Sequence, residues 1–199
     1  MTVFHYIPTK TELHPPRAFA LACMGWKGGR PDAETLSLLE RAEAAIAKEA
    51  DPRVCYALLP IQKDAGRMML DGKEICSESL SRLLEGCDAC IVFAATLGVS
   101  VDRAISIRAL SSPAEALAMD AAANAYIEAV CDSFCEAKTA EYGNLTMRFS
   151  PGYGDLALEE QKFFLELLDT SRRIGLSLTA ACMMAPVKSV SAIVGICGK

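Results

Sequence analysis

Apolar residues recur at helical spacing in several stretches of the chain. The clearest stretch begins at Asp32, a favourable N-cap residue, and runs to about Ala50. Its apolar positions form one stripe opposite the charged side, and they are Leu36, Leu39, Ala42 and Ile46. We expect a helix here that packs one face on the core.

A much longer helix is predicted over residues 113–142. Ser112-Pro113-Ala114-Glu115 is a capping box with proline at the first helical position, and Gly143 is a stop signal. Alanines fill the first half of this segment. Because small side chains allow close approach, we expect a central helix lying against a sheet.

Shorter apolar segments between the helices predict strands. These segments cover residues 54–61, 90–95, 176–184 and 189–196. Asp71-Gly72, a favoured pair for a type I′ turn, joins residues 67–70 to 73–76 in a hairpin. Further helices are expected at residues 17–24, after the cap Ser77, after the cap Ser100, and at 157–173.

This order of elements predicts an α+β fold, with a mainly antiparallel twisted sheet packed by long helices. Residues 1–88 are expected to form an N-terminal lobe of helix and hairpin, and residues 89–199 the core domain. One continuous domain is the alternative.

Composition and charge narrow the range of partners that the protein can have. The chain is 52% hydrophobic and 23% charged, which is typical of one soluble domain or a tightly joined pair. Its net charge of -5 and lack of a basic cluster disfavour nucleic acid as a partner. The most apolar run, residues 89–98, is too short to cross a membrane, and the N-terminus lacks the apolar core of a signal peptide. We therefore expect a cytoplasmic protein that does not act at a membrane.

Nine cysteines without an export signal indicate reduced thiols. Cys87-x-x-Cys90 and Cys131-x-x-x-Cys135 have spacings that suit a four-thiolate zinc or iron–sulfur site. Neither pair lies in a glycine-rich knuckle, and apolar neighbours favour cysteine as a small core residue. Two further cysteines have similar neighbours, Cys182 and Cys197. We predict no metal site, and a cysteine-ligated metal protein is the alternative.

The turn after the strand at 90–95 leaves two interpretations open. Thr96, Gly98 and Ser100 place a glycine and two hydroxyls at a helix N-terminus, where a carboxylate or phosphate can bind. Most such turns only cap the helix.

The stretch Arg148-Phe149-Ser150-Pro151-Gly152-Tyr153-Gly154-Asp155 combines turn chemistry with ligand-binding groups. Its Ser-Pro-Gly-Tyr portion is a type II turn by composition, and Asp155 can cap the following helix. Arg148 offers a planar fork for a carboxylate, Gly152 bare backbone, and Tyr153 a π face for a purine or a cation. The alternatives are a solvated arginine, or one that locks the turn by pairing with Asp155.

Three motifs in order resemble a known family. Arg148-x-x-Pro151-Gly152-Tyr153, an amphipathic helix, and Pro186-x-x-Ser189-Val190-Ser191 resemble the activation domain of vitamin B12-dependent methionine synthase, in which an Arg-x-x-x-Gly-Tyr loop holds S-adenosylmethionine. Ala94-Ala95-Thr96-Leu97-Gly98 resembles the small stand-alone members. The resemblance covers residues 90–195 well and the first third loosely.

The resemblance implies a module of methionine biosynthesis that binds S-adenosylmethionine and assists reductive reactivation, by methylation, of a cobalamin-dependent methyltransferase such as methionine synthase. Cobalamin would be carried by that corrinoid-binding partner. The site residues that it implies are Arg148, Pro151, Gly152, Tyr153, Ser189 and Ser191.

The family also places an acidic residue of the long helix at the amino end of the ligand. Glu128, Asp132 and Glu136 share one helix face, which is a solvated acidic face in the simplest interpretation. Asp132 or Glu136 falls nearest the family's position.

The sequence also departs from the family. The synthase domain continues past the last predicted strand, whereas this sequence ends at Lys199, and it lacks an Asp-x-His-x-x-Gly corrinoid motif. We expect an accessory component and not a complete enzyme. The alternative is a non-catalytic docking or storage partner of a corrinoid protein, with a decayed ligand site.

Overall fold

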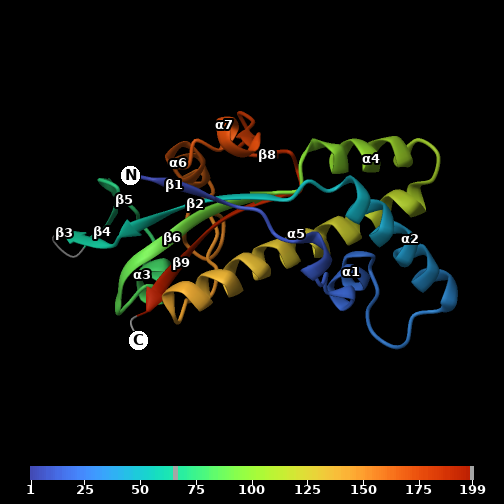
Figure 1. Ribbon diagram of the computed structural model, residues 1–199, viewed down its shortest axis with the longest axis horizontal. Helices are drawn as coiled ribbons and strands as arrows, with labels where there is room; N and C mark the ends of the chain where they lie inside the picture. The colour runs from blue at the N-terminus through green and yellow to red at the C-terminus, as the bar shows by residue number, and fades with distance from the viewer. Residues whose placement is uncertain (65–66, 198–199) are drawn as a thin grey trace.

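The main sheet has four antiparallel strands. The computed structural model describes residues 1–64 and 67–197. The strands lie in the order β1-β2-β6-β9, so each is hydrogen-bonded to the main-sheet strand before it in the chain (Figure 1). Their bounds are Val3–Tyr6, Arg53–Pro60, Cys87–Thr96 and Ser189–Cys197. The predicted α+β fold with an antiparallel sheet is confirmed.

The long helix α5 (Pro113–Tyr142) runs along one face of this sheet (Figure 1). Its N-terminal half packs against the remaining helices of this face, which are α1 (Arg17–Cys23), α2 (Ala33–Glu49) and α4 (Val99–Ala109). Phe134 of α5 is fully buried against the rings of Tyr56 and Phe93 from the sheet, with ring centroids 5.2 and 4.8 Å away. This face holds the larger core.

The predicted caps of the two longest helices are confirmed. The side chain of Asp32 accepts a 2.7 Å hydrogen bond from the Thr35 N–H, and the side chain of Ser112 accepts from the Glu115 N–H. Both donors are backbone groups of the first turn, which have no partner inside the helix.

The opposite face of the sheet carries shorter elements. They are α3 (Glu78–Leu83), α6 (Glu160–Leu167), α7 (Thr170–Ile174), and a hairpin of β7 (Ser177–Leu178) and β8 (Met184–Ala185). Leu156, Phe164 and Leu168 form a second core with Ile193 of β9 and neighbouring strand residues. The sheet is therefore covered on both faces by helices.

A second, small sheet contains the predicted hairpin. It consists of β3 (Gln62–Asp64), β4 (Arg67–Leu70) and β5 (Lys73–Glu74), and a short 3-10 helix, η1 (Lys10–Glu12), lies earlier in the chain. Asp71 and Gly72 have φ angles of 48° and 79°, as the type I′ turn requires at both positions.

Three expectations about elements are wrong. The helix predicted over 157–173 is divided into α6 and α7, because Asp169 adopts a left-handed φ of 49°. This break lets Leu168 and Ile174 both reach the core. The strand predicted over 176–184 is the β7–β8 hairpin. The N-cap of α4 is Gly98, at φ 83°, and not Ser100.

The sheet takes strands from both predicted domains, and β6 begins at Cys87 beside the predicted boundary. The division into two domains stays a prediction. Among the helices of the described ranges, none has the length and apolarity needed to cross a membrane.

Candidate functional site

The turn after Arg148 has the predicted conformation. The Tyr153 N–H donates to the Ser150 carbonyl at 3.0 Å, and Gly152 has a φ of 92°, which a type II turn requires at its third position. The Gly152 N–H donates onward to the Leu156 carbonyl at 2.8 Å. The loop is therefore held by its own backbone.

The residues before this turn lie beside the outer edge of the main sheet. Phe149 and Ile193 of β9 exchange two backbone hydrogen bonds, of 2.9 and 2.8 Å, and Thr146 donates to the Gly195 carbonyl. Since β9 is the last strand of the sheet, this segment covers one half of its outer edge. The other half, Ser189 to Ser191, lies next to the turn.

A cavity of about 510 Å³ opens at this place. Its wall is formed by the loop around Arg148, the first residues of β9, one turn of α5, and residues of α6 and β8. The residues that line it are Glu128, Met147, Arg148, Ser150, Pro151, Tyr153, Gln161, Met184, Ser189, Val190 and Ser191.

Most of the residues expected from the sequence meet at this cavity. They are Arg148, Pro151, Tyr153, Ser189 and Ser191. Gly152 shapes the turn without lining the cavity, and Asp132 reaches the site only through Arg148. Glu136 is exposed, one helical turn beyond Asp132, and does not line the cavity.

Arg148 bridges two carboxylates of α5. Its Nη2 donates to Glu128 Oε2 at 2.7 Å and to Asp132 Oδ1 at 2.9 Å. Burial acts to lower the pKa of Arg148, yet nearby Cys131 and the two carboxylates outweigh burial, and the pKa rises above its usual value. Burial raises the pKa of Asp132, and Arg148 only partly offsets this. The site therefore holds a fixed cation between two acids.

Glu128 is a charged cavity residue that was not among the site residues expected from the sequence. It lies on the same face of α5 as Asp132 and Glu136, but one turn before the pair that was favoured. The acidic spacing was a usable signal. No sequence pattern marks Gln161 and Met184 as site residues, because only the tertiary packing of α6 and β8 brings them to the cavity.

Ser191 brings an unsatisfied hydroxyl to the cavity. It is 2% exposed, and its Oγ has no hydrogen-bond partner among the described residues. Ser189, two residues earlier, is satisfied: its Oγ lies 2.8 Å from the Pro186 carbonyl and 2.9 Å from Thr96 Oγ1. Since buried polar atoms are nearly always paired in native proteins, the free hydroxyl of Ser191 indicates a place for a ligand or a water.

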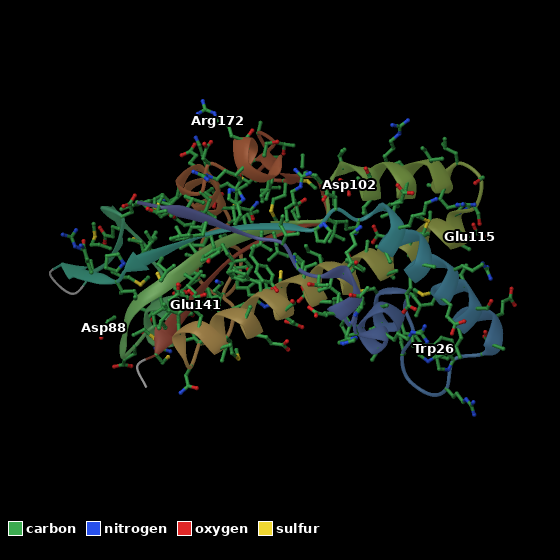
Figure 2. All side chains as sticks on the ribbon, in the orientation of Figure 1. Trp26, Asp88, Asp102, Glu115, Glu141 and Arg172 are labelled. Carbon is green, nitrogen blue, oxygen red and sulfur yellow. The ribbon has the colours of Figure 1, made fainter. Side chains whose placement is uncertain are left out.

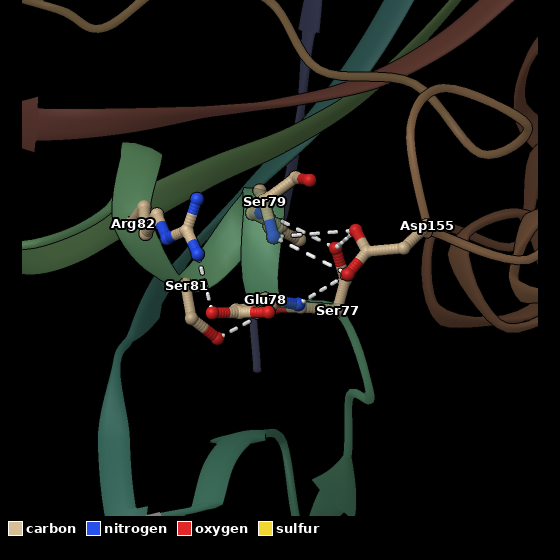
Figure 3. A network of polar contacts seen from close by, with 7 residues as sticks. Ser77, Glu78, Ser79, Ser81, Arg82 and Asp155 are labelled. Atoms are coloured by element: carbon tan, nitrogen blue, oxygen red, sulfur yellow. Dashed lines mark hydrogen bonds and ion pairs between the residues drawn. The ribbon is translucent and has the colours of Figure 1, made fainter.

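Asp155 does not cap the helix that follows it, and it does not pair with Arg148. It accepts hydrogen bonds from Ser77 Oγ at 2.6 Å, Glu78 N at 2.7 Å and Ser79 N at 3.2 Å (Figure 3). The Ser77 hydroxyl and these backbone donors hold the pKa of Asp155 well below its usual range. The predicted cap on the following helix is wrong, and the carboxylate instead ties the loop to the first turn of α3, whose N-cap is Ser77.

The N-terminus of α4 fits neither interpretation: its N-cap, Gly98, brings no side-chain cap, and the groups beside it disfavour an anion. The Gly98 N–H donates to Thr96 Oγ1 at 3.1 Å, so this hydroxyl is already engaged. Asp102 in the first turn accepts a 2.6 Å hydrogen bond from the Val187 N–H and lies where α4 meets the sheet end (Figure 2). A carboxylate in this position opposes a second anion.

The cysteines are all free thiols. Burial raises the pKa of Cys90 to about 12 and that of Cys131 above its usual range, as expected for apolar surroundings. Cys87 is also buried, and Cys135 is half-buried. The prediction that Cys182 packs in the core is wrong. Cys182 lies half-buried in the turn between β7 and β8, with a φ of 57°. Within the described residues, no three His, Cys, Asp or Glu side chains are arranged to hold a metal ion.

The chain is an α+β protein in which one long helix runs along an antiparallel sheet and a charged cavity opens at the edge strand. One solved structure with this fold is the MetH reactivation domain bound to AdoHcy. It matches with a TM-score of 0.75 and 18% sequence identity, over 98% of this chain and 78% of that one. No family model matches the sequence, and a search of curated proteins gives no match.

Proposed function

We propose that this chain is an S-adenosylmethionine-binding module that assists reductive reactivation of a cobalamin-dependent methyltransferase. The observation that carries the proposal is the grouping of Arg148, Glu128 and Asp132 at an open cavity, in a fold shared with a reactivation domain that has AdoHcy bound. The amino-acid end of such a ligand carries one positive and one negative charge. A guanidinium beside two carboxylates offers a partner to each.

Arg148 would hold the ligand carboxylate. Both of its ion pairs go through Nη2, which belongs to both two-pronged edges of the guanidinium. A ligand carboxylate that accepts two parallel bonds would therefore displace Glu128 or Asp132 from Nη2. The ligand ammonium would then take a place beside Glu128, which lines the cavity, or Asp132. This exchange keeps the partly buried Arg148 and Glu128 paired, and a charge removed from water needs such a partner.

The remaining cavity residues suit the nucleoside. Tyr153 is 61% exposed, so its ring is available to cover an adenine or the sulfonium at the cavity mouth. The Ser191 hydroxyl would gain the hydrogen-bond partner that it lacks. S-adenosylmethionine supplies a methyl group when bound. The chain's residues would hold and orient it towards cobalamin on the corrinoid-binding partner, so no general base is required.

Ligand binding tests this proposal directly. Calorimetry with S-adenosylmethionine and AdoHcy should show binding, and a ligand at 100 times its dissociation constant should stabilise the fold by about 2.7 kcal/mol. Methylthioadenosine, which lacks the amino-acid end, should bind much more weakly. The absence of any thermal shift at millimolar ligand would overturn the proposal and favour a docking or storage partner.

The reactivation role needs a second experiment. The chain should restore turnover when it is added, with a reductant and S-adenosylmethionine, to an oxidatively inactivated cobalamin-dependent methyltransferase. An Arg148→Ala variant should restore less, whereas Arg172→Ala should act like the wild type. Arg172 is a suitable control because its side chain is 86% exposed, on α7 (Figure 2). Ligand binding without restored turnover would limit the function to binding.

A further inference from the structure

Two thiols face each other at one end of the neighbouring strands β6 and β9. Cys87 is the first residue of β6, Cys197 is the last residue of β9, and the two are directly opposite on neighbouring antiparallel strands. Their Sγ atoms are 3.2 Å apart although the residues are separated by 110 positions in the chain. The pair lies at the end of the sheet marked by Asp88 (Figure 2).

The backbone at this pair suits a disulfide. The Cys197 N–H donates away from β6, to the Asn144 carbonyl at 2.9 Å, so Cys87 and Cys197 form a non-hydrogen-bonded pair. In such pairs the Cα atoms are about 4.5 Å apart, which lies inside the range of about 4.4–6.8 Å that disulfides span. The sulfur atoms must approach by only about 1 Å to reach bonding distance. A register irregularity between Cys87 and Ala89 separates the pair from the regular ladder.

Gly195 holds the Cys87 thiol in this position. A Cβ at Gly195 would lie 2.7 Å from Cys87 Sγ and 2.7 Å from Leu84 Cδ2, closer than real contacts allow. The Cys87 sulfur is therefore seated against bare backbone of β9. This limits the directions in which it can turn and keeps it near Cys197.

We propose that Cys87 and Cys197 are a thiol-oxidation site, at which a low-molecular-weight disulfide of the glutathione class forms a cross-strand disulfide. The Cys197 thiol loses its proton to solvent, and its thiolate attacks one sulfur of the reagent and releases one small thiolate. Cys87 then loses its proton, attacks Cys197 Sγ and displaces the second small thiolate. The two protein thiols are oxidised, and the reagent is reduced to two small thiols.

The two cysteines differ in a way that fixes this order. Cys197 is half-buried, whereas Cys87 is 7% exposed, so the reagent reaches Cys197 first. Burial, with the neighbouring Cys197 thiol, raises the pKa of Cys87 to about 11, so little Cys87 thiolate forms at neutral pH and the reaction with the reagent begins at Cys197. The site is independent of the proposed ligand cavity, since Ser189 and Cys197 stand at opposite ends of β9, about 26 Å apart at about 3.3 Å per residue.

Oxidation of the folded full chain with oxidised glutathione tests the proposal. The linked pair should remove two of the nine thiols per chain, beyond any mixed disulfide that the reagent forms with exposed Cys76. Peptide mapping should give one linked peptide pair, containing Cys87 and Cys197, that dithiothreitol separates. The melting temperature should rise on oxidation, because the link closes a long loop in the unfolded chain.

Matched variants identify the thiols. Cys197→Ser and Cys87→Ser should each abolish the linked peptides and the rise in melting temperature. Cys76→Ser should leave both unchanged, since Cys76 is exposed and separate from the pair. A stable glutathione adduct on Cys197 without a link, a link between other cysteines, or an unchanged thiol count would overturn the proposal. Mapping of the wild-type chain decides the matter even where a serine variant fails to fold.

Discussion

Arg148 is a cation whose acidic partners are already in place before any ligand arrives. The Arg-x-x-x-Gly-Tyr spacing made Arg148 a candidate ligand-binding residue, because a guanidinium before a Pro-Gly turn is a recognisable combination. Its partners were not evident. Glu128 and Asp132 lie on a helix 20 and 16 residues earlier, and only the packing of α5 on the sheet brings them near.

Arg148→Lys should weaken S-adenosylmethionine binding nearly as much as Arg148→Ala, because lysine cannot present a planar, two-pronged donor edge. A charge-assisted hydrogen bond contributes roughly 1.5–3 kcal/mol, which corresponds to a tenfold to hundredfold loss of affinity. Calorimetric titration of both variants, with Arg172→Ala as control, measures this. Unchanged affinity in Arg148→Ala would remove the residue from the binding site.

Asp155 should make the stability of the protein depend on pH. Its pKa is lowered in the folded state, so its contribution is present above the unfolded pKa of about 3.9 and is lost as the pH falls further. Wild type should exceed Asp155→Asn in urea stability at pH 7, and the difference should shrink below about pH 5. Asp88→Asn is the control. A difference that stays constant down to pH 3 would show that the carboxylate charge does not matter.

Helices and strands were predictable where the chain supplies its own signals. Asp32, Ser112 and Gly143 set the limits of α2 and α5 because caps and stop residues act within one turn. The division of α6 from α7 was not predictable from Asp169. Aspartate can adopt either a helical or a left-handed conformation, and here the burial of neighbouring residues favours the left-handed one. The contact of Asp155 with the first turn of α3 was not predictable either, because its backbone donors lie more than 70 residues earlier in the chain.

A side chain at Gly195 should destabilise the packing of β9 against α3 and β6, because side chains of both must shift to make room. Gly195→Ala places a methyl group 2.7 Å from Cys87 Sγ and Leu84 Cδ2. Overpacking of this kind costs about 1–3 kcal/mol of unfolding free energy, measurable by urea denaturation. The cost should be smaller in a Cys87→Ala background, because one of the two colliding atoms is then gone. An equal cost in both backgrounds would contradict this explanation.

Phe134 joins parts of the molecule that the sequence suggested were separate. Its ring contacts Tyr6 of β1, Tyr56 of β2 and Phe93 of β6. Phe134→Ala should reduce the unfolding free energy by about 3–5 kcal/mol, because it removes a fully buried ring. If residues 1–199 form one continuous domain, hydrogen exchange should show β1 and α5 losing protection together. Retained protection in β1 and β2 would support two domains.

The order of strands in the sheet also has a consequence during synthesis of the chain. β6 is a ten-residue strand, mostly apolar and without proline, and one of its edges is paired only when β9 exists. Ser189 follows Thr96 by 93 residues. At about 5–20 residues per second, the ribosome needs on the order of 5–20 s to supply that partner. For this interval an aggregation-prone edge is open, so the nascent chain, more than the finished protein, should depend on chaperones.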